Sequence, residues 1–140
     1  MANVWAKSDA MIAAELDAYT YRLNALGTVW HIHLYTNAYD PVANDSVANY
    51  TEAAFGSYSI NAINQAHWGA ASVTAHIATS TNSDTQAYSP SSGTPVTIVG
   101  YYITLGDDTT WVYAERFAAS RTLNVGDTLN VTPALRNEVA

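Results

Sequence analysis

The sequence contains no cysteine. A disulfide framework, a thiolate zinc site and a cysteine nucleophile are therefore all excluded. The chain has 140 residues, the length of one ordinary domain, and a chain of this size can bury roughly 70% of the surface that its unfolded form exposes. Its stability must therefore come from the packing of a hydrophobic core.

Long apolar runs are also absent. The N-terminal residues show no basic region followed by an uncharged apolar segment, which a secretory signal requires. No later window approaches the roughly 20 apolar residues that a membrane span needs. We therefore expect a soluble protein that is made in the cytoplasm and does not contact a membrane.

Cations are scarce. The chain has 5 Lys and Arg residues against 12 Asp and Glu residues, and its formal net charge is -7. The cations are scattered along the sequence, at Lys7, Arg22, Arg116, Arg121 and Arg136. Because nucleic-acid binding needs several clustered cations, we expect no nucleic-acid partner. The 10 tyrosines and 4 tryptophans favour sheet surfaces and contacts with other proteins instead.

The spacing of apolar residues predicts one helix, over residues 8–26. Its apolar positions follow a 3.6-residue period, at Ile12, Leu16, Tyr19, Leu23 and Leu26. Ser8 can cap the N-terminus, and Gly27 can end the helix in a left-handed conformation. We expect an N-terminal arm and this helix to occupy residues 1–27, with the helix packed on its own sandwich or on a neighbouring subunit.

The remainder, residues 28–140, has the pattern of a β-protein. Short runs of strand-forming residues alternate with turn sequences at intervals of about ten residues. We therefore predict an all-β fold: an antiparallel β-sandwich, jelly-roll-like, with about eight strands and one N-terminal α-helix. The helical segment and the sandwich are expected to form a single compact domain.

Two turn sequences set the expected neighbours of the strand at 109–118. The sequence "LGDDTT" joins it to a strand at 95–104, and "LNVGDTLNV" joins it to a strand at 127–135, both as hairpins. The strand at 109–118 should therefore lie in the interior of a sheet, between these two neighbours.

Motifs for enzymatic chemistry are missing from the sequence. It has no Gly-x-Ser-x-Gly elbow, no phosphate-binding loop and no dinucleotide fingerprint. Glu52 and Glu115 could be nominated as a pair for glycoside hydrolysis, but any acidic chain offers such pairs. We expect no catalytic residue and no cofactor, and we predict that the protein is not an enzyme.

Two of the histidines, His31 and His33, are candidate metal ligands. His31 and His33 are two positions apart on a predicted strand, so both side chains project from the same face. Without a nearby carboxylate or thiolate motif they make an incomplete site, and nothing in the sequence places His67 or His76 beside them. We therefore predict that no metal is bound.

The stretch "TWVYAERFAA" places one charge on each face of a strand, among apolar neighbours. A charge buried without a partner costs several kcal/mol. We therefore expect Glu115 to accept hydrogen bonds from backbone or tyrosine donors. Arg116 should meet a carboxylate of its own chain or lie at a subunit boundary.

Aromatic residues complete the set of candidate positions. Because neighbours in a strand point to opposite faces, one of Tyr101 and Tyr102 is expected outside the core or at an interface. The arm before the helix, with Val4 and Trp5, is expected to reach onto a partner. The candidate structural or interface residues are Trp5, Tyr101, Tyr102, Trp111, Glu115, Arg116 and Phe117.

Six stretches carry a family resemblance: "GTVWHIHLYTNAYDP", "ANYTEAAFGSYS", "WGAASV", "GTPVTIVGYYIT", "TWVYAERFA" and "LNVGDTLNVTPAL". In this order they resemble a family of small proteins from the structural gene clusters of tailed bacteriophages. The resemblance covers roughly residues 27–135. The matching positions look like fold-defining pieces rather than a site; they centre on Thr36 to Asn37, Thr51 to Phe55, Gly100 to Tyr102 and Ala114 to Phe117.

The resemblance implies a non-enzymatic virion protein, made in the host cytoplasm. It implies a capsid decoration or cement protein that binds and stabilises the lattice of the major capsid protein, with a homo-oligomer expected. The alternative is a tail, neck or fibre-associated module that binds another virion protein or a host glycan. A third reading is an enzyme that acts on cell-wall polysaccharide.

Overall fold

The computed structural model describes residues 7–25 and 29–138. These residues form one α-helix, α1 (Asp9–Ala25), and two short 3₁₀ helices, η1 (Val47–Asn49) and η2 (Gln65–His67). They also form nine strands: β1 (Trp30–Tyr35), β2 (Asn61–Ile63), β3 (Ser72–Thr74), β4 (Ile77–Thr81), β5 (Gln86–Tyr88), β6 (Val96–Leu105), β7 (Trp111–Leu123), β8 (Leu129–Val131) and β9 (Ala134–Glu138).

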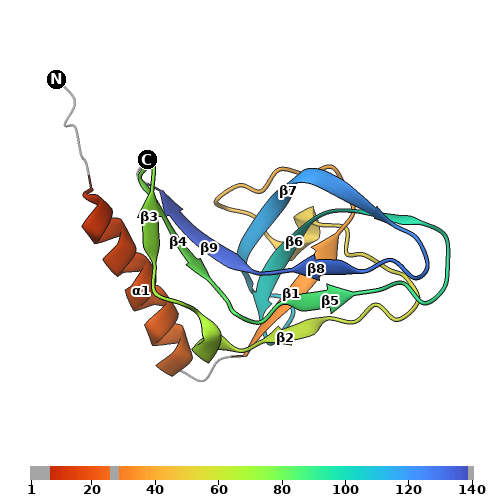
Figure 1. Ribbon diagram of the computed structural model, residues 1–140, viewed down its shortest axis with the longest axis horizontal. Helices are drawn as coiled ribbons and strands as arrows, with labels where there is room; N and C mark the ends of the chain where they lie inside the picture. Colours follow the sequence, from red (N-terminus) through yellow and green to blue (C-terminus); the bar gives the residue numbers. More distant parts are fainter. Residues whose placement is uncertain (1–6, 26–28, 139–140) are drawn as a thin grey trace. The chain divides into compact units, whose positions relative to one another are not determined.

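The predicted fold class is confirmed. The protein is mostly β, with antiparallel sheets and one N-terminal helix, as in an all-β sandwich (Figure 1). Its chain divides into two compact units. We call the unit from 1–28, 64–85 and 132–140 the helical unit, and the unit from 29–63 and 86–131 the tyrosine-rich unit. The division into an arm with helix at 1–27 and a sandwich at 28–140, within one domain, stays a prediction.

The helical unit consists of α1 packed on a three-stranded sheet, in the order β3-β4-β9 (Figure 1). The predicted cap is confirmed, because Ser8 Oγ accepts a hydrogen bond from the Met11 backbone N–H at 3.2 Å. Ile12 and Leu16 are buried, as predicted, and the helix packs against its own chain.

The predicted apolar stripe of the helix is wrong at Tyr19, which is 46% exposed. Thr20 is buried in its place, since it continues the four-residue spacing of the two buried positions before it. The hydroxyl of Thr20 donates to the Asp17 carbonyl oxygen at 3.0 Å, which satisfies it inside the unit. The side chain of Leu23 and residues Leu26 and Gly27 lie outside the described part of the chain.

Polar contacts fix the helix on its sheet. The Asp17 carboxylate accepts from the Ala71 backbone N–H at 2.7 Å, which joins the helix to the segment before β3. The Asn137 amide donates to the Ile12 carbonyl and to the Glu15 carboxylate, both at 3.2 Å, which joins it to β9. The contacts reach two different segments, the one before β3 and β9 itself, so together they define how the helix lies on the sheet.

The tyrosine-rich unit contains a four-stranded antiparallel sheet in the order β2-β1-β6-β7 and a two-stranded sheet of β5 and β8. At the centre of the larger sheet, β1 pairs with β6 from Trp30↔Leu105 to Tyr35↔Gly100. Every residue of β6 from 98 to 104 is buried. The strand is therefore covered on both faces.

Tyrosine rings form much of the core on one side of this sheet. Tyr35, Tyr50, Val99 and Tyr102 make one buried cluster. The ring of Tyr50 stacks on that of Tyr102 with centroids 4.8 Å apart, and it meets Tyr35 edge-on at 5.0 Å. Such packing buries large rings while it leaves each hydroxyl at the cluster margin to find a partner.

The predicted interior position of the strand at 109–118 is wrong: β7 is the edge strand of its sheet. The first hairpin forms as predicted, with the Leu105 N–H bonded to the Thr110 carbonyl at 3.0 Å. At the second turn the Gly126 N–H donates to the Pro90 carbonyl at 3.1 Å, which directs the chain toward β5. As a result β8 pairs with β5 and not with β7.

Candidate functional site

The adjacent charges Glu115 and Arg116 of β7 have the kinds of partner that the sequence predicts. The Tyr101 hydroxyl donates to Glu115 Oε2 at 2.9 Å, which confirms a tyrosine donor. Arg116 Nη1 donates to Asp40 Oδ1 at 2.7 Å, which confirms a carboxylate of the same chain. The hydrogen bond and negative charge of Asp40 raise the pKa of Arg116 above its ordinary value.

The β7 backbone leaves its regular pairing with β6 directly after these charges. Gly100 pairs with Arg116, but Ile98 pairs with Arg121, so the single residue Val99 lies opposite residues 117–120 of β7. Extra residues on one strand make a bulge, which bends the strand and re-aims its side chains. This bulge sets the shape of the free edge.

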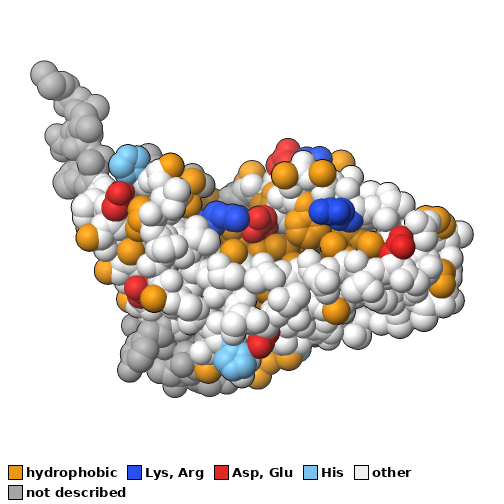
Figure 2. All heavy atoms as spheres, in the orientation of Figure 1, with side chains coloured by type: hydrophobic (Ala, Val, Ile, Leu, Met, Phe, Trp, Pro, Cys, Tyr) orange, Lys and Arg blue, Asp and Glu red, His pale blue; other side chains and the backbone are white. Residues whose placement is uncertain are grey.

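A pocket of about 320 Å³ lies at this edge, and we call it the edge pocket. It is lined by residues of β7 and β8: Glu115, Phe117, Ala118, Ala119, Arg121, Leu129 and Asn130. Figure 2 shows hydrophobic side chains gathered between β7 and β8 on this face of the protein. The edge pocket brings charged, amide, aromatic and apolar groups together at one place on the sheet edge.

The polar groups of the edge pocket are held to different degrees. Tyr101, which is 2% exposed, fixes Glu115 through its hydroxyl and contacts the Phe117 ring at a centroid distance of 6.1 Å. Arg121 is exposed and makes no ion pair with any residue of 7–25 and 29–138. The pocket thus contains one carboxylate that Tyr101 holds in place and one guanidinium that makes no ion pair within the described residues.

Sequence reasoning found Glu115 and Phe117 but missed the other residues of this pocket. Arg121, Leu129 and Asn130 lie there because the bulge and the β5–β8 pairing bring β8 to the β7 edge. Neither the bulge nor the β5–β8 pairing can be predicted from the residues of the strands that form it.

A second cluster surrounds His33, which is 1% exposed. Its Nδ1 lies 2.9 Å from Glu52 Oε1 and its Nε2 lies 2.9 Å from Thr104 Oγ1. The Tyr102 ring stacks on the imidazole with centroids 4.5 Å apart and planes 6° apart. Every polar atom of this buried side chain therefore has a partner.

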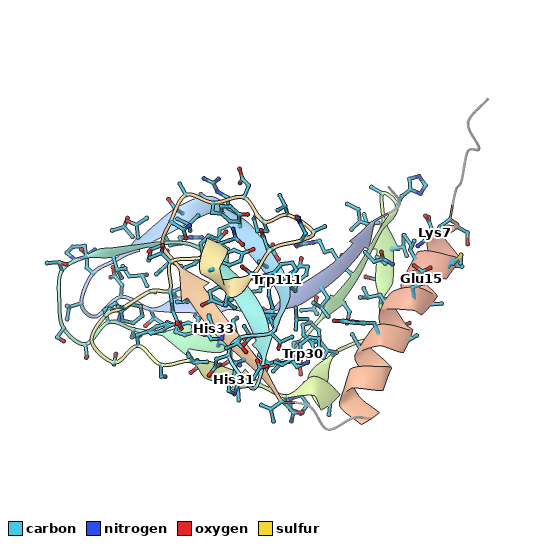
Figure 3. All side chains as sticks on the ribbon, turned by 180° about the vertical axis from the view of Figure 1, so that it is seen from behind. Lys7, Glu15, Trp30, His31, His33 and Trp111 are labelled. Atoms are coloured by element: carbon cyan, nitrogen blue, oxygen red, sulfur yellow. The ribbon has the colours of Figure 1, made fainter. Side chains whose placement is uncertain are left out.

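His31 extends this cluster toward the surface. Its Nδ1 lies 2.6 Å from Asp108 Oδ1, and the same oxygen lies 3.4 Å from His33 Nε2. Figure 3 shows both histidines along β1. Glu52 and Asp108 thus supply carboxylates beside the two histidines, although both come from loops distant in the sequence and form no local motif with them.

The absence of a bound metal stays a prediction. Within residues 7–25 and 29–138 no group of three or more potential ligands is arranged to hold a metal ion. His67 and His76 belong to the helical unit, where their Nδ1 atoms lie 2.7 Å from carboxylate oxygens of Asp84 and Asp9.

The order Glu52, His33, Thr104 has the groups of a hydrolytic triad, a carboxylate, an imidazole and a hydroxyl. Its geometry argues for a structural role. Thr104 is 0% exposed, and with His33 buried as well no substrate carbonyl can reach the hydroxyl.

The nominated hydrolytic pair is also not assembled. Glu52 lines a second pocket of about 420 Å³ with Ala53, Ala54, Tyr58, Ser59 and Ile60. Glu115 lines the edge pocket instead. Two carboxylates that share no pocket cannot flank one glycosidic bond.

A further polar network fixes the loop between β1 and β2. Asp45 accepts hydrogen bonds from the Tyr39 hydroxyl at 2.5 Å, the Tyr50 hydroxyl at 2.6 Å and the Val42 N–H at 2.9 Å. Burial opposes ionisation of this carboxyl, but the three donors outweigh it and hold the pKa of Asp45 below its usual value. Burial, followed by the contact with Asp45, raises the pKa of Tyr50 far above that of an exposed tyrosine.

The remaining predicted positions fall mainly inside the fold. Tyr101 and Tyr102 are 2% and 4% exposed, so the expectation that one of them lies outside is wrong. The reason is the central position of β6, which is covered on both faces. Trp111 is half-buried against the tyrosine cluster. Trp5 lies outside the described residues.

Comparison with known proteins finds no matching family model, no matching curated protein and no matching solved structure. Within the described part of the chain, no helix has the length and apolar character of a membrane-spanning segment.

Proposed function

We propose that the chain is a structural protein of a tailed-phage virion that acts as a capsid decoration or cement protein. It binds the lattice of the major capsid protein as a homo-oligomer, without catalysis or cofactor. The observation that carries the proposal is the set of phage-like stretches, together with the mutual contacts that they make.

Three of the six phage-like stretches, the first, the second and the fifth, bond to one another inside the tyrosine-rich unit. Asn37, in the first stretch, accepts from the Thr51 N–H at 2.8 Å and donates to the Asn49 carbonyl at 2.9 Å, both in the second. Arg116, in the fifth, reaches back to Asp40 in the first. These residues of the phage-like stretches therefore maintain the fold, as we expect for a virion protein whose role is structural.

The charge of the protein supports a position on the outside of the capsid. The net charge is -7, and Arg116 is already paired with a carboxylate. Packaged DNA would repel such a chain, whereas a protein lattice can accept it through aromatic and polar contacts.

Copy number tests the proposal directly. Quantitative mass spectrometry of purified particles of the encoding phage should find the chain in hundreds of copies, on the scale of the major capsid protein. A few copies per particle would contradict capsid decoration, and absence from the particle would overturn a virion role altogether.

A few copies would favour the second candidate, a tail, neck or fibre-associated module. The edge pocket supports this second candidate. Its mixture of one aromatic ring and several polar side chains suits a small polar ligand. A receptor-binding module needs such a pocket for its ligand.

A further inference from the structure

We propose that the edge pocket binds a neutral sugar ring of a surface polysaccharide. The inference rests on the part of the proposed function that makes the chain a binding protein rather than an enzyme. It does not depend on capsid or tail placement, so sugar binding and copy number can fail separately.

The polar groups of the pocket match a polyol. A hydroxyl group both donates and accepts hydrogen bonds, so a sugar ring requires partners of both kinds. Glu115 can only accept, Arg121 can only donate, and the Asn130 amide does both. The described lining residues include one carboxylate and one guanidinium, so neither sign of charge dominates the lining, which favours a neutral ring over an anion or a cation.

The apolar part of the pocket suits the C–H face of a sugar. Phe117 is half-buried and contacts Tyr101 from inside the fold, while it also lines the pocket. An aromatic face has negative charge density that attracts C–H groups. Ala118, Ala119 and Leu129 add small apolar contacts around the ring.

The pocket is also built before any ligand arrives. Buried Tyr101 orients Glu115 at 2.9 Å, so this acceptor loses little freedom on binding. The volume of about 320 Å³ is at the lower end of the range for small-ligand sites. Among the described residues Glu115 is the only carboxylate that lines the pocket, so the site lacks the second carboxylate that hydrolysis requires and should bind without cleaving.

Saturation-transfer NMR on the full chain tests this assignment. The probes are methyl glycosides of neutral hexoses and N-acetylhexosamines, with methyl glucuronide as the acidic comparison. We expect transfer to the ring protons of at least one neutral glycoside. Titration of that glycoside should show about tenfold weaker binding for Arg121→Met, the scale of one lost hydrogen bond to a charged group.

Matched variants make the result specific. Phe117→Ala should weaken binding to a similar extent, whereas Arg116→Met removes a cation from the same strand without touching the pocket and should bind as wild type does. Circular dichroism of each variant confirms that it folds, and the exposed Arg121 substitution keeps the test valid if Phe117→Ala does not fold.

Several outcomes would overturn the proposal. They are the absence of transfer to every neutral glycoside, a preference for the glucuronide, and binding that neither variant changes. If no glycoside binds but Phe117→Ala and Arg121→Met lose attachment to the particle, the pocket receives a protein partner and the sugar assignment is wrong. Release of methanol from the bound glycoside would contradict binding without cleavage.

Discussion

At the centre of the four-stranded sheet, the polar side chains of His33 on β1 and Thr104 on β6 are completely buried, whereas charged side chains at the β7 edge remain partly exposed. His33 and Thr104 in the centre have all their bonds inside the fold. Arg121 at the edge has a charge without an ion pair among the described residues. The difference separates two regions of one sheet: its centre maintains the structure, and its edge carries the pocket that we propose as a recognition site.

The largest effect on stability should come from a substitution at Gly100, where β6 packs most closely against the backbone of the edge strand β7. A Cβ atom added there would lie 2.2 Å from the Glu115 carbonyl oxygen and 2.7 Å from the Tyr35 ring. Because the first of these neighbours is backbone, it cannot move aside. We expect Gly100→Ala to cost at least about 4 kcal/mol or to prevent folding, as measured by urea unfolding.

Gly69→Ala is the control for this substitution. Its added Cβ would meet only the Thr81 carbonyl, at the ordinary distance of 3.5 Å. Equal stability of the two variants would mean that the β6–β7 contact is looser than the structure indicates.

The next effect concerns the buried imidazole. His33→Ala removes two hydrogen bonds and the ring that stacks on Tyr102, and it leaves a cavity in the centre of the sheet. We expect a loss of about 3 kcal/mol in the free energy of unfolding. His31→Ala, which removes a half-buried ring with one bond to Asp108, should cost about 1 kcal/mol or less. Similar losses of unfolding free energy for His33→Ala and His31→Ala would contradict the distinction between the buried centre of the sheet and its surface.

Glu115 lies where centre and edge meet, and its replacement should have an intermediate effect. Glu115→Ala takes away the acceptor of the Tyr101 hydroxyl bond, so we expect a loss of about 1–2 kcal/mol and a lower melting temperature. Glu115→Gln keeps an acceptor and should recover most of this loss. A melting temperature that neither variant changes would mean that the carboxylate is merely solvated.

The Asp45 network predicts a pH dependence. The folded-state pKa of Asp45 is lowered, so its contribution to stability is present above the ordinary value near 3.8 and is lost as the pH falls through the folded value. We expect the unfolding free energy of Asp45→Asn to be lower than that of wild type at pH 7 and to decline less below about pH 4. Tyr39→Phe removes one of the donors and should lie between the two. Parallel curves for wild type and Asp45→Asn would contradict the assignment.

The smallest effect on stability is expected at Arg116. Its partner Asp40 is 80% exposed and its own side chain 42%, and exposed ion pairs contribute little. Arg116→Ala should change the free energy of unfolding by less than about 0.5 kcal/mol. If it does loosen attachment to the particle, as measured by co-sedimentation, the edge takes part in assembly; a large loss of stability in the free protein would contradict the comparison.

Features that depend on neighbouring residues were predictable from the sequence. The helix and its Ser8 cap follow from spacing and capping within a few positions. A tyrosine donor for Glu115 followed from the aromatic content of the adjacent strand, and Tyr101 is indeed its direct partner in the β6–β7 register. Here local chemistry and tertiary structure agree.

Features that depend on long-range pairing were not predictable. Nothing within β8 says whether it joins β7 or β5, because both alternatives place the same residues in an extended chain. Likewise Asp108 reaches His31 across 77 positions and Glu52 reaches His33 across 19. The edge pocket depends on the β6–β7 bulge and on the β5–β8 pairing, which is why only part of it was predicted.

The pairing of β1 with β6 also has a consequence for the order in which the protein can fold. Its bonds join residues such as His33 and Thr104, which are 71 positions apart, and closing so long a loop costs entropy before any contact compensates for it. On the ribosome, β1 emerges well before β6 and must remain without its central partner in the meantime. The helical unit waits still longer, because β4 pairs with β9 near residue 138. Domains dominated by such distant pairings fold in milliseconds to seconds, and newly made chains of this protein should spend that time with β1 unpaired and exposed to chaperones and to one another.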